Sequence, residues 1–434
     1  MNEWKDKNLD TNLKEQLENM SEEELHEAFY TNLKFGTGGM RGIIGPGTNR
    51  MNIYTLRKAN NGYGNYLIKN FKKPSVIIAY DSRHMSHEFA VDSANVLATM
   101  GIKVYLFDRI TPTPVLSFAI RHIQASGGIV ITASHNPSQY NGYKVYDNDG
   151  CQLLPDAVNK VIKEINEGLD VFDMQLGNFD EYVSTGKIIY VGDNINNAYI
   201  EEVKKVSVFP KINKLGKVVF TPLHGTGAYI GERLLKELGY DYYCVTEQMI
   251  PDPDFKTVPS PNPEDHRAFD LAIKLAKEKG ADLVLATDPD ADRLGTAILH
   301  QNQYHFLTGN QLGALMIYYL SSHRFFKGTV FDTIVTSPLG AKIAKSKGLE
   351  SFSTLTGFKY IGQQIKLSEK TITLFFFGYE ESSGFLIKDF VRDKDSFQPL
   401  VLISEIVSYY KQHGKTLIDV LDDIYKKYGY YEFL

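Results

Sequence analysis

Three aspartates at alternate positions, Asp288, Asp290 and Asp292, occur in the middle of the chain and are followed by Arg293. They come directly after the apolar run 281–286. Carboxylates with this spacing can converge on one hard cation, because Mg²⁺ and Ca²⁺ both prefer oxygen ligands. Three like charges this close repel one another unless a cation or basic groups offset them. We therefore interpret this segment as a metal loop rather than a solvated turn.

Two other interpretations of the aspartate loop differ in strength. An EF-hand also begins with acidic residues at positions 1, 3 and 5, but it needs glycine at position 6 and glutamate at position 12. This chain has Arg293 and Leu299 there, which excludes an EF-hand. A phosphatase that uses Asp288 as its nucleophile stays open, since Asp-x-Asp after a strand suits covalent phosphoryl chemistry. Asp292 would then have no obvious role.

A serine loop, Thr132-Ala-Ser134-His135-Asn136-Pro137, follows the apolar run 128–131. A serine just past a buried strand is exposed where a substrate could reach it. A Ser-His-Asp triad explains it poorly, because the one nearby histidine is the next residue, and adjacent side chains of an extended segment point to opposite faces. No G-x-S-x-G elbow surrounds the serine either. On its own, Ser134 is typical of a turn.

Two further polar loops lie in the last third of the chain. The segment Gly378-Tyr-Glu380-Glu-Ser382-Ser-Gly384 offers acceptors and a hydroxyl suited to sugar hydroxyls, although alone it is typical of a surface turn. The segment Arg392-Asp-Lys394-Asp395 could pair with phosphate, although such a charge run alone is typical of a solvated surface. Neither loop specifies a function by itself.

The elements that must position these loops are short apolar runs alternating with helical patterns. Near-continuous apolar runs separated by helices predict a largely parallel sheet covered on both faces. The predicted strands are 75–80, 103–107, 128–131, 217–220, 281–286, 328–335 and 373–377. The strand 217–220 leads into another polar loop, Pro222-Leu-His-Gly-Thr-Gly227. In open α/β sheets ligands bind at the carboxyl ends of strands, where these loops begin.

Helix signals complete the pattern. The acidic, leucine-containing opening predicts a helix over 13–33, and another is predicted from Asn262, as N-cap, to Gly280, which can close its end. The other predicted helices are 86–100, one ending near residue 239, 307–320, 399–410 and 417–425. We predict an α/β fold of serial domains with mixed, largely parallel sheets and an active cleft at the domain interfaces. The predicted domains are 1–205, 206–318 and 319–434.

Composition narrows the function classes. The 434 residues are 43% hydrophobic and 23% charged, and the net charge of −5 gives no basic field for nucleic acid or an anionic membrane. No run approaches the roughly 20 apolar residues that a membrane span needs, and the start lacks a signal-peptide pattern. Cys151 and Cys244 have no partner motif, which favours a reducing, cytoplasmic location over a disulfide framework or a zinc site. Nothing in the sequence indicates an oligomeric state.

Taken together and in their order along the chain, these loops resemble those of the α-D-phosphohexomutase superfamily, and the resemblance covers nearly the whole chain. The segment Phe35-Gly-Thr-Gly-Gly-Met-Arg41-Gly resembles its N-terminal signature, 132–137 its phosphoserine loop and 288–293 its metal loop. Tyr379-Glu-Glu-Ser-Ser-Gly384 resembles its sugar-binding loop, and Thr356-Gly357-Phe-Lys359 the loop that distinguishes substrate orientations. Within the superfamily, the glycine-rich signature and the 357–360 segment are most similar to bacterial phosphoglucomutases and their phosphomannomutase and phosphopentomutase relatives.

The resemblance implies a phosphosugar mutase, that is, an intramolecular phosphotransferase. Ser134 would carry a phosphoryl group, which passes to a sugar phosphate to give a bisphosphate that reorients and returns its other phosphate. The net reaction would interconvert glucose 1-phosphate and glucose 6-phosphate, with glucose 1,6-bisphosphate as activator. One Mg²⁺ per chain would be held by Ser134, Asp288, Asp290 and Asp292, and would offset the charge of transfer.

The same resemblance implies roles for the remaining polar residues. Arg41 and Lys144 would stabilise charge near the transferring phosphate, and Lys394 matches a position proposed as general acid or base. A lysine in that role needs a lowered pKa, which burial or a neighbouring cation can provide. The substrate would be contacted by His135, Arg293, Thr356, Gly357, Lys359, Glu380 and Ser382.

The sequence departs from the superfamily pattern at its end. The family's fourth domain carries a phosphate-gripping loop, and no Arg-Pro-Ser-Gly-Thr-like string occurs after residue 395. We therefore expect this chain to be a three-domain piece that turns over poorly. Three alternatives to a glucose phosphate mutase stay open. They are a mutase for mannose or pentose phosphates, a phosphatase-like hydrolase, and a sugar-phosphate-binding remnant with little turnover.

Overall fold

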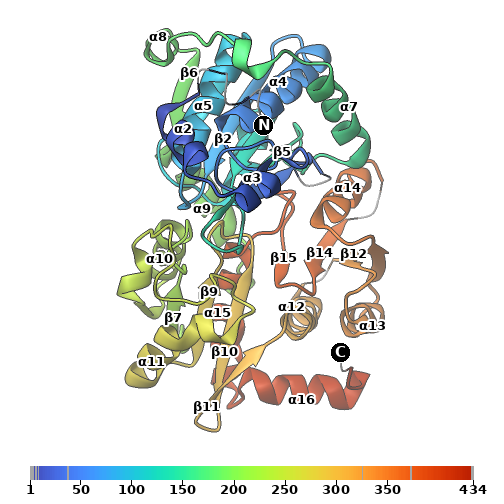
Figure 1. Cartoon of the computed structure of the whole chain (residues 1–434). Helices are drawn as coiled ribbons and strands as arrows, with labels where there is room; N and C mark the ends of the chain where they lie inside the picture. Colours follow the sequence, from blue (N-terminus) through green and yellow to red (C-terminus); the bar gives the residue numbers. More distant parts are fainter. Residues whose placement is uncertain are drawn as a thin grey trace. The chain divides into compact units, whose positions relative to one another are not determined.

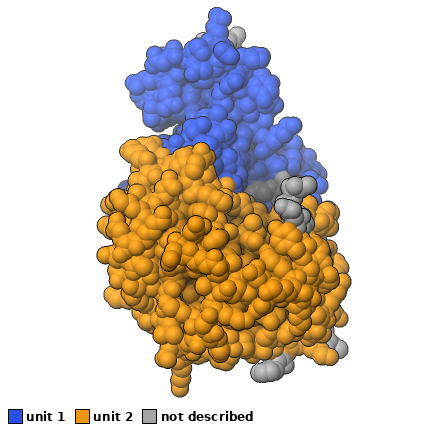
Figure 2. Space-filling view, turned by 90° about the horizontal axis from the view of Figure 1, so that it is seen from below, with its two compact units in different colours: residues 1–111, 119–193 blue, residues 112–118, 194–434 orange. Residues whose placement is uncertain are grey.

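The part of the chain that the structure describes forms three β-sheets with flanking helices (Figure 1). The computed structural model describes residues 4, 7, 9–36, 39–324, 326–371 and 374–431. Thr37 and Gly38 of the glycine-rich signature, and Thr373 at the start of a predicted strand, lie outside these residues. The chain divides into two compact units, residues 1–111 with 119–193 and residues 112–118 with 194–434 (Figure 2). The predicted α/β class with mixed, mostly parallel sheets is confirmed.

The first unit is built on a six-stranded sheet of order β1-β5-β4-β2-β3-β6. Strands β4, β2, β3 and the edge strand β6 run parallel, whereas β5 pairs antiparallel with both β4 and β1. The strands are β1 (Met40–Ile43), β2 (Ser75–Tyr80), β3 (Lys103–Phe107), β4 (Gly127–Ile131), β5 (Tyr140–Tyr146) and β6 (Ile188–Val191). Fully buried side chains such as Ile78, Leu106 and Ile129 form its core, so the sheet is a rigid platform for the loops at its edge.

Helices of this unit pack on the sheet and on one another, α5 against β2, β3 and β4, and α4 against α5 and α7. They are α2 (Thr11–Glu18), α3 (Glu22–Phe29), α4 (Ile53–Asn70), α5 (Ser86–Thr99), α7 (Pro155–Asn166), the 3₁₀ turn η1 (Val171–Asp173) and α8 (Phe179–Ser184). Helix α6 (Thr113–His122) is divided between the two units. The helix predicted over 13–33 is wrong as one element, because Ser21 starts a new helix with a capping box to Glu24.

The second unit contains a five-stranded sheet, β11-β10-β9-β7-β8, and a four-stranded sheet, β13-β12-β14-β15. The first comprises β7 (Lys217–Thr221), β8 (Asp241–Cys244), β9 (Leu283–Thr287), β10 (Leu294–His300) and β11 (Gln303–Leu307). The second comprises β12 (Thr329–Thr333), β13 (Glu350–Thr354), β14 (Phe375–Glu380) and β15 (Gly384–Leu386). The predicted domains 1–205, 206–318 and 319–434 would hold one sheet each, and these boundaries stay a prediction.

The helices of the second unit are α9 (Asp193–Lys204), α10 (Ala228–Glu237), η2 (Thr246–Met249), η3 (His266–Phe269), α11 (Asp270–Lys279), α12 (Gly309–His323), α13 (Pro338–Ser346), α14 (Phe358–Ser368), α15 (Phe397–Gln412) and α16 (Leu417–Tyr428). The helix start predicted at Asn262 is wrong: the Asn262 side chain accepts from the Glu264 N–H in a turn, and α11 begins at Asp270. Its predicted end is confirmed, since Gly280 closes α11 with φ +62°. Among the described residues, no helix has both the length and the apolar character needed to cross a bilayer.

Candidate active site

Ser134 lies just beyond the end of β4 in an unusual backbone conformation. Its φ of +52° is left-handed, a region that residues with a Cβ rarely adopt. The Ser134 N–H donates to Thr132 Oγ1 over 2.8 Å, and Ser134 Oγ lies 3.2 Å from His135 Nδ1. The expectation that the two side chains point to opposite faces is therefore wrong, because the chain is not extended at Ser134. The expectation that the serine is exposed is also wrong, since Ser134 is 4% exposed, and a histidine nitrogen lies within hydrogen-bond distance of it.

Two predicted basic residues of the same unit belong to the strands next to this loop. Arg41, on β1, donates from Nη1 to Asn136 Oδ1 over 2.8 Å, which joins it directly to the serine loop. Lys144, on β5, is buried and pairs in register with Val130 of β4. Gly142 permits this arrangement, since a Cβ there would lie 2.4 Å from the Thr132 carbonyl oxygen. The first unit thus brings a serine, a histidine, an arginine and a lysine to one end of its sheet.

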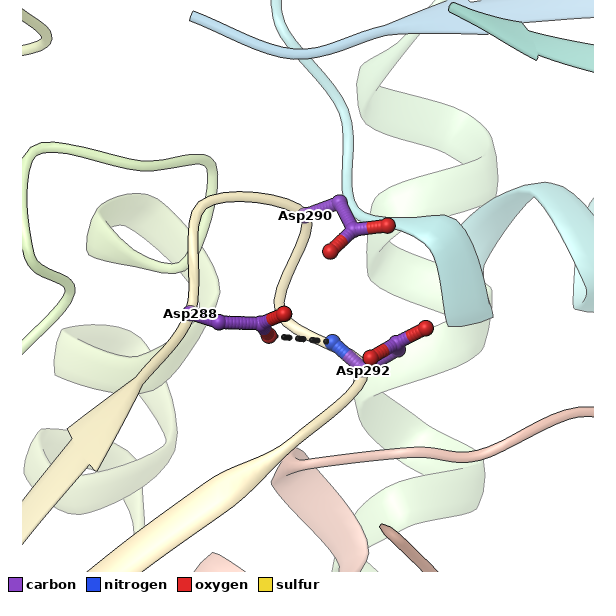
Figure 3. Close-up of side chains that lie close together, drawn as sticks. All are labelled: Asp288, Asp290 and Asp292. Carbon is purple, nitrogen blue, oxygen red and sulfur yellow. Dashed lines mark hydrogen bonds between the residues drawn. The ribbon is translucent and has the colours of Figure 1, made fainter. Parts of the chain in front are cut away.

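The three predicted metal ligands lie in the tight connection between β9 and β10 (Figure 3). Thr287 pairs with Leu294 in the ladder, so residues 288–293 form the whole hairpin loop. The Asp292 and Arg293 N–H groups both donate to Asp288 Oδ1, over 3.1 and 3.0 Å, and so fold the loop back on its first carboxylate. One oxygen from each of Asp288, Asp290 and Asp292 lies within 4.8 Å of the others.

Burial makes these three carboxylates electrostatically unusual. Asp288 and Asp290 are fully buried and Asp292 is 2% exposed. Burial, followed by the negative charges of Asp290 and Asp292, raises the pKa of Asp288 well above its ordinary value. A divalent cation would reverse this by offsetting the charge. An all-oxygen set of three converging carboxylates suits Mg²⁺ or Ca²⁺ rather than a softer metal, so the loop fits the predicted ion.

Neighbouring residues hold the metal loop in place. Thr226 donates both its N–H and its hydroxyl to the Pro289 carbonyl, over 2.8 and 2.9 Å. Thr113 Oγ1 donates to Asp290 Oδ2 over 3.0 Å, and Ser396 Oγ donates to the Ala291 carbonyl over 2.6 Å. The metal loop is thus fixed from three separate segments of the second unit.

Two cations connect the metal loop to the loops predicted to hold the sugar. Arg293 Nη1 donates to the Ser382 carbonyl over 3.1 Å, and Lys394 Nζ lies 3.2 Å from Asp292 Oδ2. Glu380 Oε1 accepts from the Gly357 N–H over 2.9 Å, which ties the sugar loop to the start of α14. The structure therefore brings together the predicted metal, sugar and orientation loops of the second unit.

The predicted substrate contacts on α14 differ in their surroundings. Thr356 is exposed and Gly357 has a φ of +117°, a conformation suited to glycine, at the start of the helix. Lys359 is 8% exposed, with Nζ 5.4 Å from the centre of the Tyr360 ring. Thr356 is therefore open to solvent, whereas the Gly357 N–H is already bound to Glu380.

Lys394 and Arg392 differ in what they can do. Burial alone would lower the pKa of Lys394, but Asp292, Asp393 and Glu380 outweigh it and raise this pKa above its ordinary value. Lys394 is therefore a charged ammonium in the metal-free protein, rather than the lowered-pKa group that a general base requires. Arg392 is fully buried and is paired with Glu369, and it also donates to the Asp389 carbonyl, so its cation is engaged within the protein.

Sequence reasoning missed several residues that support the site. Arg83 donates to carbonyls of the serine loop, Thr113 and Thr226 hold the metal loop, and Glu264 lies 3.5 Å from Arg293. A usable signal existed for Arg83, because Asp81-Ser-Arg83 directly follows strand β2, as the predicted loops follow theirs. Thr226 lies in the loop 222–227 after β7, and its residue type alone does not indicate that it supports the metal loop.

These features define a class of protein, a serial α/β enzyme with a serine loop and a loop of three converging carboxylates at strand ends. Matches of this chain to protein-family models agree with this class of protein. Phosphoglucomutase/phosphomannomutase α/β/α domain I matches residues 32–171, domain II residues 197–301 and domain III residues 308–428. The chain belongs to the phosphoglucomutase/phosphomannomutase family.

Similarity to individual proteins supports the same family. The chain is 40% identical over 437 aligned residues to the phosphoglucomutase of Staphylococcus aureus strain MRSA252, covering 99% of this chain and 78% of that protein. The structure is similar to that of a candidate phosphomannomutase from Thermus thermophilus, with a TM-score of 0.78, 25% identity, and coverage of 92% and 84% of the two chains. A phosphoglucomutase/phosphomannomutase family protein from Burkholderia thailandensis shares the fold, with a TM-score of 0.72, 20% identity, and coverage of 90% and 79%.

Proposed function

We propose that this protein is a phosphoglucomutase, which interconverts glucose 1-phosphate and glucose 6-phosphate through a phosphoserine and a bisphosphate intermediate. The observation that carries the proposal is the buried triad Asp288, Asp290 and Asp292, whose oxygens converge within 4.8 Å beside the cations of Arg293 and Lys394. A metal loop with adjacent basic groups is what phosphoryl transfer requires, because its catalysis consists largely of positioning and charge stabilisation. The 40% identity to phosphoglucomutases favours glucose phosphates over mannose or pentose phosphates.

Ser134 Oγ is the proposed carrier of the phosphoryl group. In the first half-reaction the bond between phosphorus and Oγ breaks, a bond to a sugar hydroxyl forms, and the hydroxyl proton ends on Oγ. In the second half-reaction the other phosphate of the bisphosphate returns to Oγ, and that proton goes to the released sugar oxygen. His135 Nδ1, 3.2 Å from Oγ, is the proposed hydrogen-bond partner of the serine hydroxyl between the two steps.

Charged side chains of each unit have complementary proposed roles. Asp288, Asp290 and Asp292 would hold one Mg²⁺ per chain, with Ser134 as a further ligand. The ion, when bound, supplies a positive charge that neutralises the transferring phosphoryl group. Arg293 and Lys394 add positive charge next to the carboxylates.

The substrate is proposed to be held by the other predicted residues. In the first unit, Arg41 and Lys144 bind phosphate at the end of the sheet. In the second, the ligands of the sugar phosphate are Thr356, Gly357, Lys359, Glu380 and Ser382. Glucose 1,6-bisphosphate would serve as activator by placing the first phosphoryl group on Ser134. The cytoplasm remains the proposed location, since Cys151 and Cys244 are separate free thiols.

The test is turnover by the purified 434-residue protein. It is incubated with glucose 1-phosphate, MgCl₂ and a trace of glucose 1,6-bisphosphate, and glucose 6-phosphate is read with a coupled dehydrogenase. Ser134→Ala should abolish the product, whereas Ser126→Ala, which changes a buried serine just before β4, should retain most of it.

Three results would change the assignment. Faster turnover of mannose or ribose phosphate would move the protein to another branch of the family. Release of inorganic phosphate from glucose 1,6-bisphosphate, dependent on Ser134, would support a hydrolase instead. Binding of sugar phosphate by a well-folded sample without product would contradict a working mutase.

A further inference from the structure

Arg83 lies beneath the serine loop, within the first unit. Its side chain is fully buried, and its guanidinium donates to main-chain carbonyls of that loop. Nη2 reaches the carbonyls of Ser134, over 2.6 Å, and of Asn136. Nη1 reaches those of Pro137 and Tyr140, over 2.8 and 3.2 Å. One planar cation thus holds four carbonyls at fixed directions, which suits the rigid fork of an arginine.

A buried counter-charge holds this guanidinium. Asp81 Oδ2 lies 3.3 Å from Arg83 Nε, and both side chains are fully buried. Asp81 Oδ1 accepts from the Arg83 N–H over 2.9 Å and from Ser86 Oγ over 2.7 Å. Burying two charges is unfavourable unless their geometry and hydrogen bonds are nearly complete. Here the pair is oriented so that the free edge of the guanidinium faces the serine loop.

The serine loop needs such support because of its conformation. Ser134 has a φ of +52°, which is unfavourable for a residue with a Cβ. The carbonyls of Ser134 and Asn136 lie on either side of His135, and both are bound to Nη2. Holding the Ser134 carbonyl fixes the peptide that follows Ser134, and the bond from the Ser134 N–H to Thr132 Oγ1 fixes the peptide that precedes it. Together these two bonds restrict φ and ψ of Ser134, and the direction of its Cα–Cβ bond follows from these angles.

We propose that Arg83 is a positioning residue for phosphoryl transfer, which keeps Ser134 in its left-handed conformation and directs Oγ toward the phosphoryl group. The inference rests on the proposed function, since it requires that Ser134 accepts phosphate. Lysine cannot replace Arg83, because a single ammonium cannot bind four carbonyls and the Asp81 carboxylate together. Arg83 itself does not touch the substrate in this mechanism.

The experiment measures phosphorylation of Ser134 directly. The dephosphorylated full-length chain is mixed with glucose 1,6-bisphosphate and MgCl₂, and the added mass is followed by intact-protein mass spectrometry well below the melting temperature. Phosphate leaves the sugar oxygen for Ser134 Oγ, and the serine proton passes to the glucose monophosphate released. Arg83→Lys should slow this step about 30-fold, equivalent to about 2 kcal/mol at 1.36 kcal/mol per tenfold.

Arg57→Lys is the matched control. Arg57 is also a largely buried arginine of the first unit, paired with Asp92 over 2.6 Å, but it contacts no residue of 132–137 among the described hydrogen bonds and ion pairs. Both variants should lower the melting temperature, yet Arg57→Lys should keep the rate within about threefold of wild type. Equal rates for Arg83→Lys and Arg57→Lys would reduce Arg83 to a structural residue and overturn the proposal.

Amide hydrogen exchange of the loop 134–141 gives a second readout that separates this inference from the proposed function. Exchange there should rise at least tenfold in Arg83→Lys and stay unchanged in Arg57→Lys. If wild-type Ser134 takes no phosphate, the proposed function fails, and with it the catalytic part of the inference, while exchange still decides whether Arg83 holds the loop. If Arg83→Lys does not fold, Asp81→Asn replaces it. A rate unchanged by Asp81→Asn would overturn the proposal, and a fall of at least threefold would support it.

Discussion

The aspartate loop should respond to one substitution in opposite directions with and without metal. Asp290→Asn removes one charge from the triad but keeps a side-chain oxygen that can accept from Thr113 Oγ1, as Asp290 Oδ2 does now over 3.0 Å. In the metal-free protein the variant should be more stable than wild type, because carboxylate repulsion is relieved. In the presence of Mg²⁺ it should be less stable, because the ion loses a charged ligand.

The size of the effect follows from the geometry. Two unit charges 4.8 Å apart repel by about 3.5 kcal/mol at an effective dielectric constant of about 20, and Asp290 takes part in two of the three pairs. The relief is smaller than that sum, because the raised pKa of Asp288 favours its neutral form and Lys394 offsets Asp292. A net gain of about 1–2 kcal/mol is expected, or a rise of about 2–8 °C in melting temperature for a unit of this size.

Binding of Mg²⁺ should reverse the order of stability of wild type and Asp290→Asn. At 100 times its dissociation constant, the ion should stabilise wild type by about 2.7 kcal/mol. If the variant binds 100-fold more weakly, the same concentration gives it only about 0.4 kcal/mol. Thermal unfolding at pH 7.5 in EDTA and across a MgCl₂ titration measures both values. Asp270→Asn, which changes an exposed carboxylate in the first turn of α11, is the control and should show neither effect.

Two results would refute this argument. A variant less stable than wild type in EDTA would show that repulsion within the triad is already compensated. A variant stabilised by Mg²⁺ as much as wild type would show that Asp290 is not a ligand, and would remove the main support for the metal loop.

Three further predictions concern other residues of the second unit. Burial raises the pKa of Asp332 to about 6, so the folded state binds this proton more tightly than the unfolded chain and loses stability as pH rises from about 4 to about 6. Asp332→Asn should therefore be about 2–3 kcal/mol more stable than wild type at pH 8 and equal to it near pH 4, by urea unfolding. Thr226→Val, which removes the hydroxyl bond to Pro289, should weaken Mg²⁺ binding about three- to tenfold by calorimetry; unchanged affinity would contradict its supporting role. Gly384→Ala would place a Cβ 2.2 Å from Lys394 Cδ and should lower turnover at least tenfold with little loss of secondary structure, by coupled assay and circular dichroism.

The fold was predictable wherever burial alone decides an element. Strands β2 and β3 begin and end at the predicted residues, because their apolar side chains such as Ile78 and Leu106 are fully buried and an aspartate follows each strand. The helix start at Asn262 was not predictable in the same way, since asparagine and proline favour a turn as readily as a helix end. Here the turn forms, and the helix begins only where Asp270 leads the amphipathic stretch.

Residues of the candidate site also differ in whether the sequence alone identifies them, again for a physical reason. The aspartate loop could be found because chemistry acts through the residues named in the motif, and their alternate spacing already places three carboxylates together. The relative orientation of the Ser134 and His135 side chains could not be predicted, because it depends on the φ angle of Ser134, which the residue types do not specify. Arg83 was missed for a related reason. Arginines are mostly exposed, and only the carbonyls around a buried one reveal what it holds. A sequence motif therefore identifies the groups that react, whereas the groups that aim them are found from hydrogen-bond partners.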